Sequence, residues 1–187
     1  MKSELTAKIE ATRVARFKDL KPFSLAFVDS LLPDGRKRNA KVIGKGVVEN
    51  PAMSPPIAED HGFTISWILV PPGGGAGLHS HKTAEIFIPI NGALTVLIGD
   101  EREEIELDAL DVISVPVGVM RGFRNKGATE LKVLAMVGGD TGGGAVTWHQ
   151  DVLSRAATQT GLAVDEAGRL VKLDNFTQPA DLEGSTV

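Results

Sequence analysis

The sequence of 187 residues contains no cysteine and no tyrosine, and aromatic residues make up only 5% of it. Without cysteine the chain has no disulfide bond, no thiolate metal site and no cysteine nucleophile. Without tyrosine no phenol of this chain can act as an acid. Histidines and carboxylates are therefore the side chains to examine for metal binding.

Long apolar runs are also absent, and nothing in the sequence approaches the roughly 18 residues that a helix needs to cross a bilayer. The first 20 residues lack the apolar stretch of a secretory signal peptide. We therefore expect a cytoplasmic protein without a membrane partner. The formal net charge of -4 argues against nucleic acid as a partner, because neutralising phosphates requires a basic face.

Length and composition predict one domain, because 187 residues with 42% hydrophobic side chains suffice for one core but not for two full-sized domains. Three regions are distinguished: a strand-bearing arm over 1–60, a barrel core over 61–140, and a glycine-rich linker, helix and tail over 141–187. An arm outside the barrel could contact a second copy, so a homodimer is a further expectation.

Two apolar segments of the arm, residues 22–32 and 41–49, are predicted to be strands. A turn-rich and basic segment, 33–39, separates them. Its three consecutive basic residues at 36–38 are expected to form a solvent-exposed loop rather than an anion site.

The middle region consists of short apolar runs that are rich in β-branched residues and are separated by turns containing glycine, asparagine or proline. In residues 63–69 the side chains alternate, with four apolar residues on one face and Thr64 and Ser66 on the other. Closely spaced strands of this kind indicate an antiparallel sandwich or barrel.

The last region begins with glycines and continues with a predicted helix near 148–160. Thr147 and Gln150 fit a capping box at its start, and Gly161 fits the position after its C-cap. From about residue 174 the chain is expected to be a loose tail.

Histidine is rare, with four in the chain, yet His79 and His81 stand two apart and Glu85 follows closely. If residues 79–87 are extended, these three side chains and Phe87 point to one face. Two imidazoles and a carboxylate suit a divalent first-row metal ion and leave coordination positions open for a substrate or dioxygen. The alternative is a set of exposed polar residues at the start of a strand. The carboxylate in register and the apolar surroundings favour the metal site.

The residues around the histidines follow the spacing Gly73-x5-His79-x-His81-x3-Glu85-x6-Gly92. This spacing resembles the first signature motif of the cupin family at every defined position, and residues 109–125 resemble the second motif more loosely. The resemblance implies an all-β fold, a small antiparallel barrel of the jelly-roll (double-stranded β-helix) type, with the ligands pointing into its lumen. The ligand set suits iron, manganese, nickel and zinc alike.

Two positions depart from the second motif. Leu110 stands where a glycine is expected, and Arg121 stands where a histidine would supply the fourth metal ligand. A guanidinium stays protonated and offers a metal no lone pair. Arg121 is expected to pair with Glu85 in a metal-free site, to bind an anionic substrate bidentately beside a three-ligand metal ion, or to turn to solvent. Arg124 is expected on the other face, in contact with solvent.

The remaining histidines, His61 and His149, are expected in surface or capping roles rather than as ligands. A glycine loop separates His61 from His79, so no strand parity relates the two. Trp67 and Trp148 are expected to be packing residues.

Two functions fit the resemblance, because a fold of this kind does not determine its chemistry. The first is a metal-dependent enzyme, oxygenase-like or more narrowly dioxygenase-like, in which His79, His81 and Glu85 hold the metal ion. Arg121 would then orient a small organic acid beside the ion. The alternative is a non-catalytic cupin that binds a small molecule and has a structural Glu85–Arg121 pair. The expected partner in the first case is a small anionic organic molecule.

Overall fold

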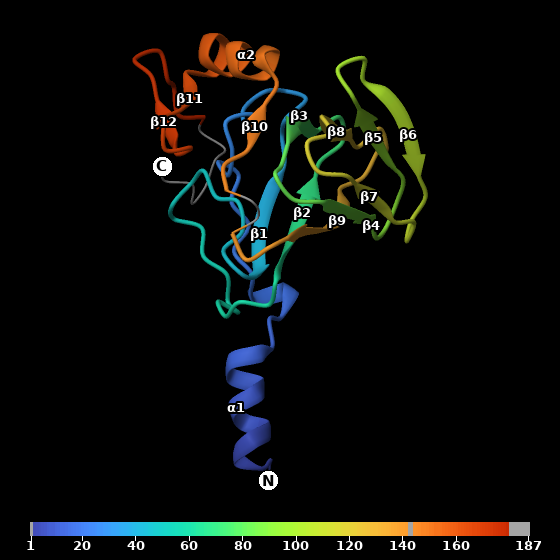
Figure 1. Cartoon of the computed structure of the whole chain (residues 1–187), viewed down its shortest axis with the longest axis vertical. Coiled ribbons are helices and arrows are strands. Elements are labelled where there is room, and N and C mark those ends of the chain that lie inside the picture. Colours follow the sequence, from blue (N-terminus) through green and yellow to red (C-terminus); the bar gives the residue numbers. More distant parts are fainter. Residues whose placement is uncertain (1, 142–143, 180–187) are drawn as a thin grey trace.

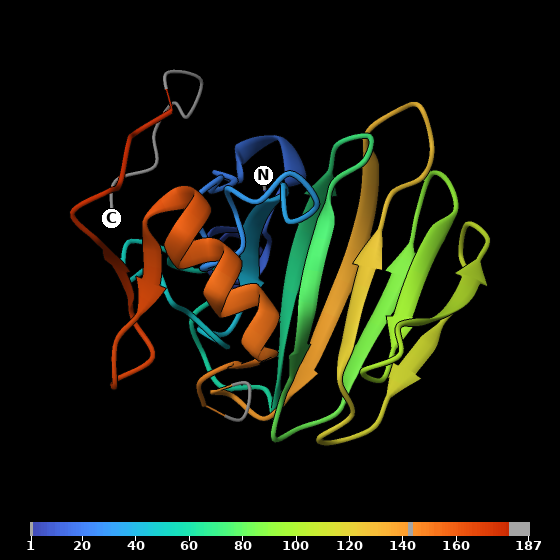
Figure 2. The same ribbon diagram turned by 90° about the horizontal axis from the view of Figure 1, so that it is seen from above.

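The computed structural model describes residues 2–141 and 144–179, and within them two antiparallel sheets lie face to face (Figure 2). The first sheet has the order β1 (Arg38–Ile43), β2 (Phe63–Val70), β9 (Leu131–Gly138), β4 (Glu85–Pro89) and β7 (Ile113–Val115). The second has the order β10 (Thr147–Trp148), β3 (Gly75–Ser80), β8 (Arg121–Arg124), β5 (Leu94–Ile98) and β6 (Glu103–Leu107). The predicted all-β, jelly-roll architecture is confirmed.

The main core lies between the two sheets, where alternate residues of each strand point inward. Phe87 of β4 and Phe123 of β8 meet there edge to face, with ring centroids 5.3 Å apart. In β2 the alternation is as predicted, and Thr64 and Ser66 line the interior. Trp67 points the other way and packs against Phe17. The inner face of β2 therefore begins with two hydroxyl groups beside an interior cavity and continues with Ile68 and Val70 in the main core.

The departure at Leu110 has a backbone explanation. Leu110 has a φ of 74° and is 69% exposed. A residue with a side chain pays about 1–2 kcal/mol in this left-handed region, which glycine enters freely. The turn at Leu110 thus has the left-handed backbone conformation that explains the glycine of the motif. An exposed leucine is tolerated there because its side chain lies in solvent.

The arm differs from its prediction in two ways. Residues 22–32 form buried turns rather than a strand, with a single bridge from Phe23 to Asn39. Their apolar side chains pack against the C-terminal helix in a second core cluster, so burial replaces strand pairing. The second predicted strand is shifted to Arg38–Ile43, because Gly44 and Gly46, both at positive φ, turn the chain away.

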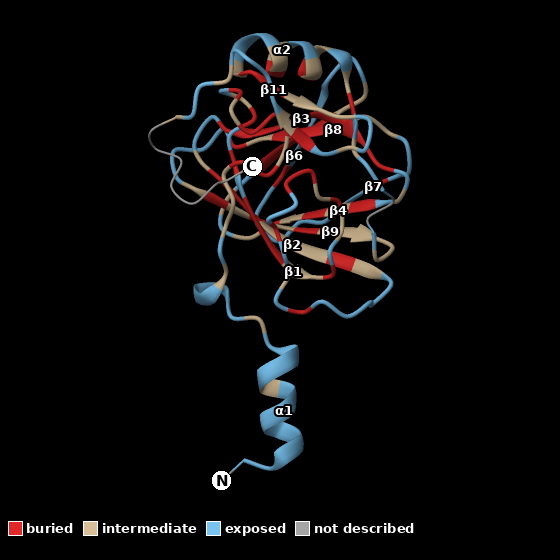
Figure 3. Ribbon diagram, turned by 90° about the vertical axis from the view of Figure 1, so that its left-hand side faces the viewer, coloured by how far each residue is buried: buried red, intermediate tan, exposed pale blue. Residues whose placement is uncertain are grey.

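An N-terminal helix, α1 (Glu4–Arg13), was not predicted from the sequence and has no buried residue. It extends away from the sheets and is followed by a short 3₁₀ turn, η1 (Phe17–Asp19) (Figures 1 and 3). The expected homodimer stays a prediction, and Leu5 and Ile9 are the exposed apolar side chains through which α1 would contact a second copy.

The C-terminal helix is confirmed as α2 (Gln150–Thr160), and a hairpin of β11 (Leu162–Val164) and β12 (Leu170–Lys172) follows it. Its predicted capping box is wrong. Thr147 is paired with Ser80 in β10, and the side chain of His149 accepts the capping hydrogen bond instead. Gly161 ends the helix at a φ of 68°.

Parts of the predicted linker and tail, residues 142–143 and 180–187, lie outside the described residues. Within the described part of the chain, no helix is both long enough and apolar enough to cross a membrane.

Candidate metal centre and adjoining cavity

The three predicted ligands converge, although residues 79–87 are not one continuous strand. His79 lies in β3 of the second sheet and Glu85 opens β4 of the first, so the chain crosses between the sheets just after His81. One ligand atom from each residue lies within 4.8 Å of the others, and the three residues are 5–7% exposed. The crossing, rather than strand parity, brings the imidazoles of one sheet to the carboxylate of the other.

The distances between these ligand atoms suit one metal ion. The Nε2 atoms of His79 and His81 lie 3.7 Å and 3.5 Å from the same oxygen, Oε2 of Glu85. Two donors about 2.1 Å from one ion and about 110° apart lie about 3.4 Å from each other. His79 is also oriented from behind, because its Nδ1 lies 2.8 Å from the carbonyl oxygen of Gly77. A proton on Nδ1 would donate to this carbonyl and leave the Nε2 lone pair for a metal.

The protonation states of His81 and Glu85 also favour the binding of a cation. Burial lowers the pKa of His81 to about 3, against the opposing pull of the Glu85 carboxylate. Burial alone would raise the pKa of Glu85, but the two histidines and Arg121 outweigh it and lower that pKa to about 2. At neutral pH the site therefore contains a neutral His81 imidazole and a carboxylate, the forms that bind metal. The donor set and its spacing fit a divalent ion.

Arg121 occupies the position of the missing fourth ligand. It lies opposite His79 in the β3–β8 pair and is fully buried, so the expectation that it turns to solvent is wrong. Its Nε donates to Oε2 of Glu85 at 2.9 Å, and its Nη1 donates to the carbonyl of Val119 at 3.1 Å. Its Nη2 is buried without a hydrogen-bond partner. The Glu85 pair is therefore present, while binding of an anion by Arg121 stays a prediction.

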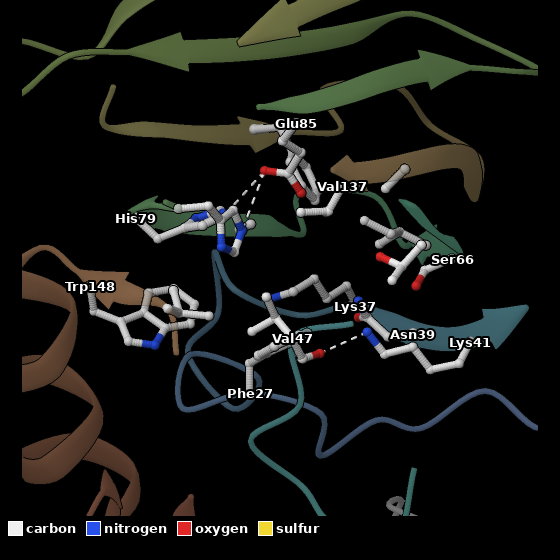
Figure 4. A pocket seen from close by; sticks show the side chains of 17 residues that line it. Phe27, Lys37, Asn39, Lys41, Val47, Ser66, His79, Glu85, Val137 and Trp148 are labelled. Carbon is white, nitrogen blue, oxygen red and sulfur yellow. Dashed lines mark hydrogen bonds and ion pairs between the residues drawn. The ribbon is translucent and has the colours of Figure 1, made fainter. Parts of the chain in front are cut away.

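A cavity of about 60 Å³ adjoins the three ligands (Figure 4). At about 10–15 Å³ for each water, it has room for roughly four to six waters or a ligand of similar size. His79, His81 and Glu85 form one side, and Arg121 does not line it. The opposite side comes from the arm, where Lys37 precedes β1 and Asn39 and Lys41 belong to it.

The arm side is the part of the site that the sequence did not reveal. The expectation of an exposed basic loop was wrong for Lys37, which is buried and donates to Oδ1 of Asp29 at 2.6 Å. Lys41 is buried as well and donates to the carbonyl of Val47 at 2.7 Å. Burial lowers its pKa to about 8, and Glu85 opposes this shift. Positions 37, 39 and 41 share one parity, which could have indicated a common face had the bounds of β1 been known.

Trp148 packs beside His79 at the cavity and is itself hydrogen-bonded to a buried carboxylate. Trp148 lines the cavity, and its ring centroid lies 5.2 Å from that of His79. Its Nε1 donates to Oε1 of Glu49 at 2.6 Å, and Oε2 of Glu49 accepts from the backbone N–H of Val28. Burial raises the pKa of Glu49 to about 7. Trp148 is thus a packing residue, as expected, and one with a fixed orientation.

The other singled-out residues lie away from the metal centre. His61 is exposed, with Nδ1 2.6 Å from the carbonyl of Glu59, and His149 caps α2, so the expected surface and capping roles are confirmed. Arg124 does not line the cavity, which agrees with its expected place on the other face, but it is only partly exposed to solvent and pairs with Asp34 at 2.8 Å. It is held there because it also donates to the carbonyls of β3 and β8 at 2.7 Å.

Comparison with known proteins agrees with the fold. The family model described as "Cupin domain" matches residues 66–137, which contain the three candidate ligands and Arg121. The polyketide cyclase RemF from Streptomyces resistomycificus has a similar structure, with a TM-score of 0.52 and 17% identity over 67% of this chain and 78% of RemF. No curated protein matches the chain.

A second solved structure, a cupin 2 domain-containing protein from Halorhodospira halophila, has a TM-score of 0.50 and 23% identity over 66% of this chain and 77% of that protein. At such identities the structural likeness shows the fold alone. The chain thus contains a cupin domain, and the resemblance inferred from its two motifs is confirmed.

Proposed function

We propose that this protein is a metal-dependent, oxygenase-like cupin that holds one divalent first-row metal ion and acts on a small organic acid in the adjoining cavity. The observation that carries the proposal is the convergence of two buried imidazoles and a buried carboxylate on one side of a cavity. A bound ion would supply Lewis-acid chemistry or a site for dioxygen, because three protein ligands leave coordination positions open.

The chain's own residues prepare this site in three ways. The Gly77 carbonyl orients His79, and Arg121 holds Glu85 ionised and fixed in direction. The side chains of Phe123 and Trp148 add apolar surface to the cavity wall beside the candidate ligands. The small volume restricts the ligand to an acid of few non-hydrogen atoms.

Elemental analysis of protein purified without chelator or polyhistidine tag tests the proposal. We expect about one first-row metal ion per chain, lost in the double variant His79→Ala, His81→Ala. The matched control is His61→Ala, which removes an exposed imidazole outside the site and should leave the metal content unchanged. Metal-free wild-type protein of undiminished thermal stability would contradict the proposal.

A specific observation favours a second function, a non-catalytic cupin that binds a small molecule without metal. The 2.9 Å ion pair between Arg121 and Glu85 already compensates the buried carboxylate. In a metal-free protein this pair would be structural, and the cavity would serve binding alone. The same elemental analysis separates the two functions.

The variant Arg121→His tests what Arg121 contributes. Metal affinity should rise about tenfold or more, because an imidazole becomes available and a repelling charge is removed. If Nη2 of Arg121 also anchors the acid, affinity for small carboxylates should fall in the same variant. If carboxylate affinity is unchanged, Arg121 only positions Glu85, and the anion anchor lies elsewhere in the cavity.

A further inference from the structure

The side of the cavity opposite the metal ligands has one cationic group without an anionic partner. Lys37 is neutralised by Asp29 at 2.6 Å, and Glu85 is engaged by Arg121 at 2.9 Å. Lys41 forms no ion pair with any described carboxylate, and its one hydrogen bond goes to the Val47 carbonyl. Because an ammonium has three N–H donors, two of those of Lys41 remain for a ligand.

The position of this ammonium is held by its surroundings. Lys41 comes from β1, and the turn after that strand folds back over it. A Cβ atom placed on Gly46, whose φ is +59°, would lie 3.3 Å from Nζ of Lys41 and 2.9 Å from Oγ1 of Thr64. The glycine turn therefore closes on the lysine, and Figure 4 shows Lys41 on the far side of the cavity from His79 and Glu85.

The charge pattern across the cavity indicates an anionic ligand. Burial lowers the pKa of Lys41 and Glu85 partly opposes this shift, so the two sides of the cavity interact electrostatically. A buried cation without a counterion is costly, and a bound anion would remove that cost. Asn39, next to Lys41 on the same face, also has a buried Oδ1 without a hydrogen-bond partner. A hydroxyl group on the ligand would satisfy it.

We propose that Lys41 is the residue that binds the carboxylate of the ligand, which is a small hydroxy acid lying in the cavity between Lys41 and the candidate metal centre. This inference rests on the proposed function for the position of the metal centre, but the role of Lys41 is tested independently of it. The ligand's carboxylate accepts hydrogen bonds from the ammonium, and its hydroxyl group donates to Oδ1 of Asn39.

Calorimetric titration of lactate, acetate and the uncharged lactamide tests the proposal, with protein in zinc-loaded and metal-free forms. The variants are Lys41→Met, which keeps an unbranched chain without charge, and Lys41→Arg, which keeps the charge. Lys45→Met is the matched control, since Lys45 is an exposed lysine four residues away. Thermal unfolding of each variant confirms that it is folded.

We expect Lys41→Met to weaken lactate binding at least tenfold, while Lys41→Arg and Lys45→Met stay within about threefold of wild type. Lactamide should bind wild type at least tenfold more weakly than lactate, and acetate more weakly than lactate because it lacks the hydroxyl group. Wild-type affinity for lactate should fall as pH rises through about 8, where Lys41 loses its proton. The Lys41→Arg variant should keep its affinity over the same range.

Equal binding of lactate by wild type and Lys41→Met would overturn the proposal, and so would equal binding of lactate and lactamide by wild type. Absence of binding by both acids to both forms of the protein would overturn it as well. Failure of zinc to bind contradicts the proposed metal function instead. The ratio of the lactate affinities of wild type and Lys41→Met, measured in the metal-free form, still decides the role of Lys41.

Discussion

The two sides of the cavity differ in how their buried charges are compensated. On the metal side Glu85 is surrounded by two imidazoles and the guanidinium of Arg121. On the β1 side Lys37 is paired with Asp29, whereas Lys41 has only a neutral carbonyl. A compensated charge contributes to the folded structure, while an uncompensated one is available to a ligand. The comparison therefore predicts that removing the charge of Glu85 lowers the free energy of unfolding strongly, whereas removing the charge of Lys41 leaves it nearly unchanged.

The largest effect is expected for Glu85→Ala in the metal-free protein. Arg121 would be left fully buried without its carboxylate, which should lower the free energy of unfolding by about 3–5 kcal/mol. Chemical denaturation measures this loss. The double variant Glu85→Ala, Arg121→Leu should recover much of it, because neither charge is then unpaired. A single variant as stable as wild type would show that Arg121 finds another partner or reaches solvent.

An intermediate effect is expected for Trp148→Phe, which removes one of the two donors to the buried carboxyl of Glu49. The free energy of unfolding should fall by about 1–3 kcal/mol. Because the pKa of Glu49 is raised to about 7, the loss should be larger at pH 8, where the unpaired group is ionised, than at pH 6. Trp67→Phe, in a half-buried ring that packs on Phe17, is the control and should show no such pH dependence.

The smallest effect on stability is expected for Lys41→Met. At pH 7 its free energy of unfolding should stay within about 1 kcal/mol of wild type, because loss of one hydrogen bond is offset by removal of a buried charge. Burial lowers the pKa of Lys41 from 10.5 to about 8, so the unfolded chain binds more protons between these two pH values.

Wild-type stability should therefore decline as pH falls from about 10.5 to about 8, and the variant should lack this decline. Its stability relative to wild type should be greater at pH 7 than at pH 10.5, as denaturation at the two pH values measures. The control Lys45→Met should follow wild type. A loss of several kcal/mol in Lys41→Met at pH 7 would mean that Lys41 is a structural residue, and the contrast between the two sides would fail.

The prediction from sequence succeeded where the signal is local. Alternating side chains identified β2, and the spacing of His79, His81 and Glu85 identified the candidate ligands. It failed for residues 22–32, which are as apolar as a strand but pack against α2. It failed in the same way at Thr147, which has the residue type of a cap but is held in β10 by pairing with Ser80. In both places a distant segment decided the local conformation.

The sequence by itself determined the β architecture, the three candidate metal ligands and the unusual guanidinium at position 121, because each depends on residue type and short-range spacing. Only the tertiary structure decided which charges face the cavity. Asp29 and Lys37 are close enough in sequence to be considered together, but nothing local indicates that both are buried. Lys41 meets the metal side only because β1 joins the sheet beside β2 and so reaches the lumen. The burial and compensation of a charge depend on partners that folding supplies from distant positions, and for that reason residue order alone could not identify Lys41.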